Sequence, residues 1–279
     1  MKIYKKFLSF LDLILNEGLI AVLQKVQDIF RKNTYKNPVQ KERQKILNKI
    51  IKISNKKILH GFYKGTILSC KSNWGTLDFS AKLLGIYENQ VQEKIIEIKK
   101  KYQINSIFNF GAAEGYHLCG LIKNEYFDFG YAFEPSQEEI FNLKENLKLN
   151  NIENKVKIFN SVGNIQICKD IIDNEKIKKT FFLIDIEGDE FSLFNNENIK
   201  FLKNHFFLIE DHSTLYHNKN YKEKYYKIIK ENFTIEIIHS DSRNPHKFEE
   251  LNNFNDDEKW LSVSESRPNT MSWMLLKPL

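Results

Sequence analysis

A turn of small residues is followed by an acid in a spacing that suits nucleotide binding. Residues 111–115 read G-A-A-E-G, and Glu134 ends the next apolar run, about 20 residues further on. Glycine lets the backbone turn sharply and lets a ligand approach closely. An acid at that distance accepts hydrogen bonds from a ribose diol in nucleotide-binding α/β sheets.

The glycine spacing restricts the ligand. The dinucleotide fingerprint is G-x-G-x-x-G, and here Ala113 replaces the middle glycine that would admit a pyrophosphate. No Lys-Ser/Thr pair follows, so the turn is not a P-loop. We expect a ligand with ribose hydroxyls but no phosphates, and S-adenosylmethionine (SAM) is such a ligand.

Acids and a histidine follow two later apolar runs. Asp185 and Glu187 come at the end of the run 181–186, and His212 follows the run 205–209. Ligands bind beyond the carboxyl ends of strands in open α/β sheets, so we expect these side chains to converge near residues 111–115. His212 is the first candidate for a general base and Asp185 the second. The plainer alternatives are a loop histidine and an acceptor for backbone N–H groups.

The acids that follow these apolar runs also permit a second interpretation, a metal site. Asp185, Glu187 and His212 could form an oxygen-rich magnesium site with Glu210 and Asp211, but we expect solvated carboxylates and no metal.

Two further residues are weaker candidates for the site. His117, just inside the helix after the glycine turn, ranks third as a base. Arg267 could clamp an anionic acceptor, and a surface ion pair is its plainer interpretation.

Composition favours one sizeable α/β core with an accessory segment. The chain has 279 residues, of which 42% are hydrophobic and 28% charged. The net charge of +6 is spread along the chain, which favours a solvated surface over a nucleic-acid partner. The three cysteines are far apart, so we expect neither zinc site nor disulfide, and a reducing cytoplasm is the expected location.

Alternating apolar runs and amphipathic segments predict a doubly wound, mostly parallel, seven-stranded α/β sheet. The strands are expected at residues 104–110, 129–133, 156–159, 181–186, 205–209, 234–238 and 272–276. Residues 58–70 contain turn glycines and predict short strands or a hairpin. Residues 241–258 have little periodicity and predict a long loop that recognises substrate or acts as a lid.

The N-terminal part predicts helices outside the sheet. Residues 1–32 and 39–53 both have amphipathic helical spacing. The first helix is expected to pack on its own domain or on a second copy in a homodimer. Peripheral contact with a membrane surface is the alternative. We therefore predict an accessory region at 1–83 and the main domain at 84–279.

Several stretches together resemble the FkbM-type family of SAM-dependent methyltransferases. They are L-G-I-Y-E at 84–88, N-F-G-A-A-E-G-Y at 109–116, F-E-P at 133–135, I-D-I-E-G-D-E at 184–190, I-E-D-H at 209–212, and S-R-P leading to a tryptophan at 266–273. The resemblance covers residues 84–279. It implies a Rossmann-like class I methyltransferase fold, SAM as cofactor, and O-methylation of a sugar or secondary-metabolite hydroxyl.

The resemblance also implies roles for the residues of the first two motifs. Gly111, Ala113 and Gly115 would line the methionine end of SAM, and Glu134 would bind the ribose hydroxyls. Asn109 stands where the family usually has an acid. An amide still forms hydrogen bonds, but it lacks the charge that attracts the SAM ammonium group.

Later motifs are assigned in the same way. Ser161 and Val162 would belong to the loop that contacts adenine. Asp185 and Glu187 would lie beside the methyl donor and the acceptor.

Three functions follow from these expectations. The first is an O-methyltransferase acting on a small-molecule or glycan hydroxyl. The second is an RNA or protein methyltransferase, although I-D-I-E-G-D-E replaces the N-P-P-Y-like motif of amino-group enzymes. The third is a catalytically weakened SAM-binding or scaffold protein, which Asn109 motivates.

Overall fold

The computed structural model describes residues 38–72, 75–188, 190–212, 219–267 and 271–279. The predicted helix at residues 1–32 lies outside the described residues, so its contacts with a membrane or a second copy stay predictions. The chain divides into two compact units, residues 1–45 and 46–279, and the sheet belongs to the second. Within the described residues, no helix is long and apolar enough to cross a membrane.

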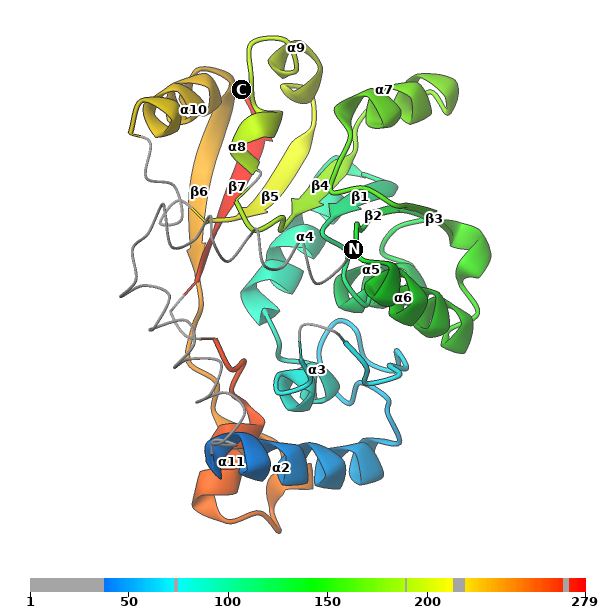
Figure 1. The fold of residues 1–279 in the computed structure, drawn as a ribbon, viewed down its shortest axis with the longest axis vertical. Coiled ribbons are helices and arrows are strands. Elements are labelled where there is room, and N and C mark those ends of the chain that lie inside the picture. The colour runs from blue at the N-terminus through cyan, green and yellow to red at the C-terminus, as the bar shows by residue number, and fades with distance from the viewer. Residues whose placement is uncertain (1–37, 73–74, 189, 213–218, 268–270) are drawn as a thin grey trace, which may run out of the picture. The chain divides into compact units, whose positions relative to one another are not determined.

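Seven strands form one mixed sheet in the order β3-β2-β1-β4-β5-β7-β6 (Figure 1). Their bounds are β1 Ser106–Phe110, β2 Phe129–Phe133, β3 Val156–Phe159, β4 Phe181–Ile184, β5 Phe206–Glu210, β6 Phe233–His239 and β7 Ser272–Pro278. β7 runs antiparallel to both β5 and β6, and the other pairings are parallel. The prediction of a mostly parallel seven-stranded α/β sheet is confirmed.

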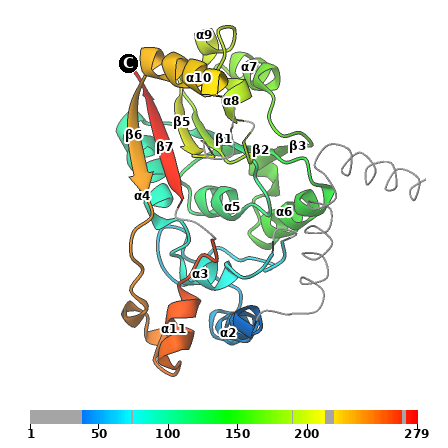
Figure 2. The same ribbon diagram turned by 60° about the vertical axis from the view of Figure 1, so that its left-hand side comes forward.

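Helices cover both faces of the sheet (Figure 2). The helices are α2 Pro38–Ser54, α3 Phe79–Leu84, α4 Asn89–Tyr102, α5 Tyr116–Lys123, α6 Gln137–Leu149, α7 Ile165–Asn174, α8 Glu190–Leu193, α9 Ile199–Leu202, α10 Lys219–Asn232 and α11 Asp256–Ser262. Apolar residues of α4, α5 and α6 belong to the core on one face, and those of α7 to α10 belong to the core on the other. The fold is therefore doubly wound.

Alternation along each central strand explains why both faces are apolar. In β4, Leu183 belongs to one core, while Phe182 and Ile184 belong to the other. The ring of Phe182 stacks between Phe108 of β1 and Phe207 of β5, with centroids 5.0 and 4.9 Å away. Because both faces of such a strand are buried, its sequence is a continuous run of apolar residues.

One expectation about the connections is wrong, and another is confirmed in part. Residues 241–258 are not a long loop, because they contain the 3-10 helices η3 Pro245–Lys247 and η4 Glu249–Leu251 and the start of α11. The side chain of Leu251 is fully buried, which anchors this insert. Residues 58–70 form no strand of the sheet, but backbone hydrogen bonds on both sides of an antiparallel bridge between Lys57 and Ile67 make a short hairpin, which was one of the two predicted alternatives.

Candidate cofactor and catalytic site

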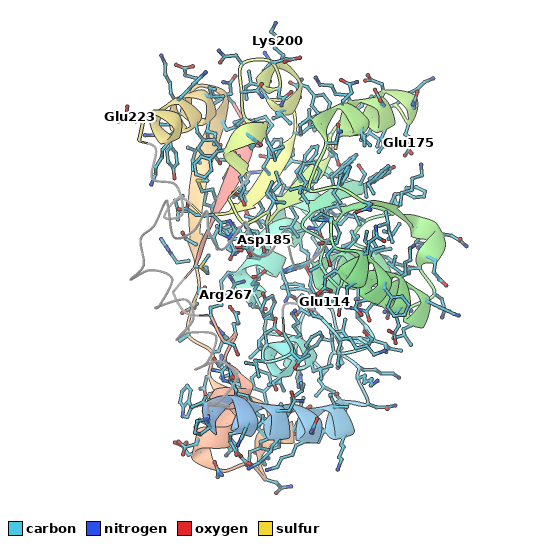
Figure 3. All side chains as sticks on the ribbon, viewed as in Figure 1. Glu114, Glu175, Asp185, Lys200, Glu223 and Arg267 are labelled. Carbon is cyan, nitrogen blue, oxygen red and sulfur yellow. The ribbon has the colours of Figure 1, made fainter. Side chains whose placement is uncertain are left out.

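A cavity of about 560 Å³ opens at the carboxyl ends of β1, β2, β4 and β5. Its volume lies within the range of about 300–1,000 Å³ that is typical of small-molecule sites. Asp185, Glu114 and Arg267, which line it, come from separate parts of the chain and lie near one another (Figure 3). The predicted convergence of the strand ends is therefore present.

The glycine turn holds β1 against the end of β4. Gly111 has φ +75°, and a Cβ there would lie 1.7 Å from the carbonyl oxygen of Asp185. The N–H of Asp185 donates to the carbonyl of Phe110 at 3.0 Å. Only glycine fits this close crossing, which places the turn and the acid side by side in the cavity.

Gly115 serves packing rather than the cavity lining. A Cβ there would lie 2.3 Å from Cδ1 of Leu143 on α6. Gly111 and Ala113 line the cavity, whereas Gly115 does not. Its part in holding a ligand would be indirect, because it lets α5 begin close to α6.

Glu134 is fixed beside the glycine turn. Its Oε2 accepts the N–H of Ala113 at 2.9 Å, and its Oε1 accepts the N–H of Ser136 at 2.8 Å. Burial raises the pKa of Glu134, against the lowering effect of these two hydrogen bonds. Each carboxylate oxygen keeps a second lone pair. Glu134 lines the cavity and can therefore accept hydrogen bonds from a ligand diol.

The other residues predicted to bind the cofactor lie at different depths. Val162 lines the cavity, whereas Ser161 does not. The buried hydroxyl of Ser161 has no hydrogen-bond partner within the described chain. Asn109 is buried in β1 and donates to the carbonyl of Leu183 at 3.4 Å. It lines a smaller recess of about 70 Å³ that shares Asp185 with the main cavity.

The acids after β4 and β5 surround His212. Its Nδ1 lies 2.9 Å from Glu190, while Nε2 lies 3.7 Å from Asp185, 3.6 Å from Glu187 and 3.5 Å from Glu210. Burial favours the neutral ring, but the Glu190 hydrogen bond and the other carboxylates raise the pKa of His212 overall. His212 is 6% exposed and lies behind the acids, of which Asp185, Glu187 and Glu210 line the cavity.

Glu190 is a site residue that sequence reasoning missed. Its Oε1 accepts the N–H of Ile186 at 3.0 Å as well as facing His212. Burial opposes its ionisation, but these hydrogen bonds lower the pKa of Glu190 overall. Its place in I-D-I-E-G-D-E was visible, whereas its contact with a residue 22 positions later was not.

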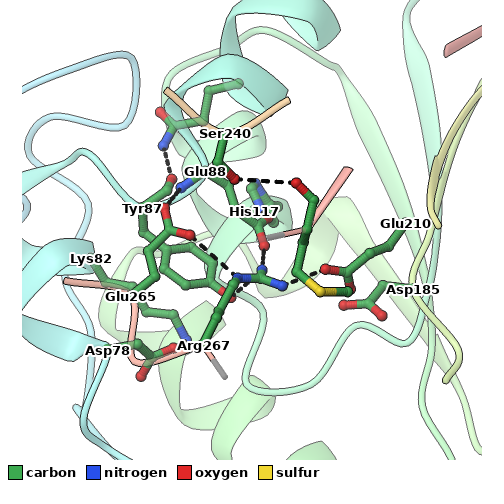
Figure 4. Close-up of polar contacts among 12 residues, drawn as sticks. Asp78, Lys82, Tyr87, Glu88, His117, Asp185, Glu210, Ser240, Glu265 and Arg267 are labelled. Atoms are coloured by element: carbon green, nitrogen blue, oxygen red, sulfur yellow. Dashed lines mark hydrogen bonds and ion pairs between the residues drawn. The ribbon is translucent and has the colours of Figure 1, made fainter. Parts of the chain in front are cut away.

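Arg267 is surrounded by carboxylates (Figure 4). Its guanidinium contacts Glu88 and Glu210, lies 3.3 Å from Glu265, and donates to the hydroxyl of Tyr87 at 3.1 Å. The ion-pair interpretation is therefore confirmed, although the pair is largely buried rather than on the surface. An anionic acceptor would have to displace a carboxylate to reach this arginine.

Glu210 sits between Arg267 and Asp185. Burial and the adjacent Asp185 carboxylate raise the pKa of Glu210, and the Arg267 contact acts in the opposite direction. Burial also raises the pKa of Asp185. Two neighbouring acids with raised pKa values are a common arrangement at catalytic sites.

The second cation of the cavity is also paired. Lys82 Nζ lies 2.8 Å from Asp78 and 2.6 Å from Glu114, above the ring of Tyr87. Against the effect of burial, these carboxylates raise the pKa of Lys82. The lining thus holds two paired cations and a larger set of acids, namely Asp78, Glu114, Glu134, Asp185, Glu187, Glu210 and Glu265.

His117 is placed as a structural residue. Its Nδ1 lies 3.0 Å from the hydroxyl of Tyr63, and its Nε2 lies 2.7 Å from Glu88. Burial lowers the pKa of His117 to about 4. Both ring nitrogens are occupied, so this residue does not serve as a base for a ligand in the cavity.

Comparisons with known proteins address the fold. No protein-family model and no curated protein matches the sequence. Among solved structures, the chain is similar to an O-methyltransferase from Bacillus cereus in complex with SAH (S-adenosylhomocysteine), with 9% identity, a TM-score of 0.45, and coverage of 90% of this chain and 97% of that one.

Two other solved structures are similar to a comparable degree. A precorrin-6y C5,15-methyltransferase from Geobacter metallireducens GS-15 has 11% identity and a TM-score of 0.43, covering 70% of this chain and 90% of that one. An m1A22 tRNA methyltransferase from B. subtilis has 9% identity and a TM-score of 0.40, covering 67% and 66%. The activity is therefore argued from the residues of the cavity.

Proposed function

We propose that the protein is a SAM-dependent methyltransferase that methylates a hydroxyl group on an uncharged or positively charged small molecule or glycan. One observation carries the proposal. The Gly111 turn with Glu134 and the acidic residues around Asp185 line the same cavity, so a nucleoside and a reacting hydroxyl would meet there. The resemblance to FkbM-type methyltransferases supports the same activity.

The residues present fit the proposed cofactor. Glu134 would accept hydrogen bonds from the ribose diol through the lone pairs that its backbone partners leave free. Val162 would contact the adenine, and Gly111 and Ala113 would lie against the methionine end. When bound, SAM supplies a methyl group on a sulfonium, which is already a good leaving group.

Asp185 is the proposed proton acceptor. It lines the cavity directly, whereas the ring of His212 lies behind it, 3.7 Å from Oδ1. An acceptor hydroxyl would lose its proton to the Asp185 carboxylate as its oxygen attacks the methyl carbon. The cavity would align the oxygen and the methyl group for an in-line displacement.

The charge of the cavity supports an uncharged or cationic acceptor. Both cations of the lining, Lys82 and Arg267, already contact carboxylates. A phosphate-bearing acceptor such as RNA would meet an excess of acids there, including Glu187, whose side chain is 64% exposed. The hydroxyl of a neutral or amino sugar meets no such repulsion.

Calorimetry with SAM and SAH tests the proposal. We expect saturable binding of both to the purified full-length protein. Glu134→Ala should weaken binding at least tenfold, because the diol loses a charged acceptor. Glu138→Ala, the same change at an exposed position of α6, is the control and should bind as the wild type does. Failure of the wild type to bind either compound would sink the proposal.

A further inference from the structure

Nε2 of His212 points at three carboxylates without a hydrogen bond. The oxygens of Asp185, Glu187 and Glu210 lie 3.5 to 3.7 Å away, which is beyond good hydrogen-bond distance. The His212 side chain is 5% exposed, and Oδ1 of Asp185 is buried with no hydrogen-bond partner in the described chain. A largely buried nitrogen and several carboxylate oxygens thus converge on one point, and the distances from Nε2 are too long for good hydrogen bonds.

Glu190 fixes the other side of the ring. An ionised carboxylate only accepts hydrogen bonds, so Nδ1, 2.9 Å from Glu190, carries the hydrogen. In the neutral ring, Nε2 is then left with a lone pair facing the three acids. A histidine that donates its other N–H to a carboxylate is the arrangement that orients histidine ligands in metal sites.

The spacing of these atoms fits coordination. One atom each from Asp185, Glu187 and His212 lies within 4.8 Å of the others. A cation about 2.1 Å from each of two ligands in a tetrahedral arrangement holds them about 3.4 Å apart. The distances of 3.7 and 3.6 Å from Nε2 to the Asp185 and Glu187 oxygens are close to this value.

We propose that Asp185, Glu187 and His212 bind one divalent transition-metal ion, with Glu190 as the outer partner that orients His212. A mixed set of one imidazole and two carboxylates suits Zn²⁺ or Mn²⁺, whereas Mg²⁺ prefers oxygen ligands alone. Three protein ligands leave a coordination position open, and Asp185 and Glu187 line the cavity where that position lies. This proposal replaces the expectation of solvated carboxylates, and it does not depend on methyl transfer.

Isothermal titration of the EDTA-treated full-length protein with ZnCl₂, MnCl₂ and MgCl₂ tests the site. We expect one saturable site that prefers Zn²⁺ or Mn²⁺ over Mg²⁺ by at least tenfold. Glu187→Gln and His212→Gln should each weaken binding at least tenfold. Glu187 is largely exposed, so its variant keeps the test valid if the His212 variant fails to fold. His239→Gln, at an exposed position, is the control and should bind as the wild type does.

Three results would overturn the proposal: no saturable binding, Mg²⁺ bound as tightly as the transition ions, or unchanged binding in Glu187→Gln. Glu190→Gln tests the positioning role. It should weaken the ion about 10- to 100-fold and alter the visible absorption of bound Co²⁺, which a purely structural role would leave unchanged. Ion binding that persists while SAM binding is absent would refute the proposed function and leave this site standing.

Discussion

At the scale of single residues, Gly111 is a position in the site where a side chain does not fit. Gly111→Ala would place a Cβ 1.7 Å from a backbone oxygen and impose φ +75° on an L-residue. We expect a loss of about 2–4 kcal/mol in the free energy of unfolding, together with weaker SAM binding. Urea denaturation and calorimetry measure the two effects.

Gly65 provides the matched control for this change. It has φ +86°, but nothing lies within 4 Å of a Cβ there. Gly65→Ala should therefore cost only the backbone strain, about 1–2 kcal/mol, and leave SAM binding intact. Equal losses for the two variants would show that the close crossing at Asp185 is unimportant.

Asp185 is the residue whose chemistry the mechanism needs. Asp185→Asn keeps the shape of the side chain but cannot accept the hydroxyl proton. We expect the rate of methyl transfer to fall about 10²- to 10⁴-fold, with little change in SAM affinity. Radiolabelled SAM with a cell extract as the source of acceptor measures the rate. Asp173→Asn, at an exposed position of α7, should retain the wild-type rate.

At the scale of elements, the insert after β6 depends on a helix cap. Asn255 accepts the N–H of Glu258 at 2.9 Å, and Glu258 accepts the N–H of Asn255 at 3.1 Å, forming a capping box at the start of α11. We expect Asn255→Ala to lower the free energy of unfolding by about 0.5–2 kcal/mol, measured by urea denaturation. Asn253→Ala, at an exposed neighbour, should change it by less than about 0.5 kcal/mol.

The elements of the sheet were predictable because their burial leaves a pattern in the sequence. Strands β1, β4 and β5 are buried at every residue, so they appear as apolar runs. The insert was not predictable in the same way. Its 3-10 helices are three residues long, too short for a periodic signal. Its buried residues Phe248, Leu251 and Phe254 belong to a core built from distant parts of the chain.

The site was predictable only as far as the strand ends reveal it. Glu134, Asp185 and Glu187 follow strands, and topology brings them to one edge of the sheet. The contacts of Glu190 with His212 and of Arg267 with Glu88 join residues far apart in sequence, so no local pattern contains them. The pairing of Arg267 with carboxylates therefore became visible only in the structure.

At the scale of the whole molecule, the charge of the cavity is opposite to that of the chain. The net charge is +6, yet acids outnumber cations in the lining. Arg267 keeps this arrangement stable because it connects acids before α4, at the end of β5 and near the C-terminus. The cavity therefore depends on a long-range ion-pair network as well as on the sheet.

Removing the positive charge of Arg267 should destabilise the protein. Arg267→Gln would remove the positive charge that Glu88, Glu210 and Glu265 share, and we expect a loss of about 3–5 kcal/mol in the free energy of unfolding. Thermal and urea denaturation measure it. Lys277→Gln removes a more exposed pair with Glu236 at 3.1 Å and should cost about 1 kcal/mol or less. Similar losses for both variants would contradict the role given to Arg267.

The central claim is that SAM binds across the cavity between Glu134 and Asp185. A crystal structure of the protein with SAH tests it most directly. The account predicts both ribose hydroxyls within hydrogen-bond distance of the Glu134 carboxylate and the sulfur facing the side of the cavity that holds Asp185. SAH bound elsewhere, or in this cavity with its ribose turned away from Glu134, would contradict it.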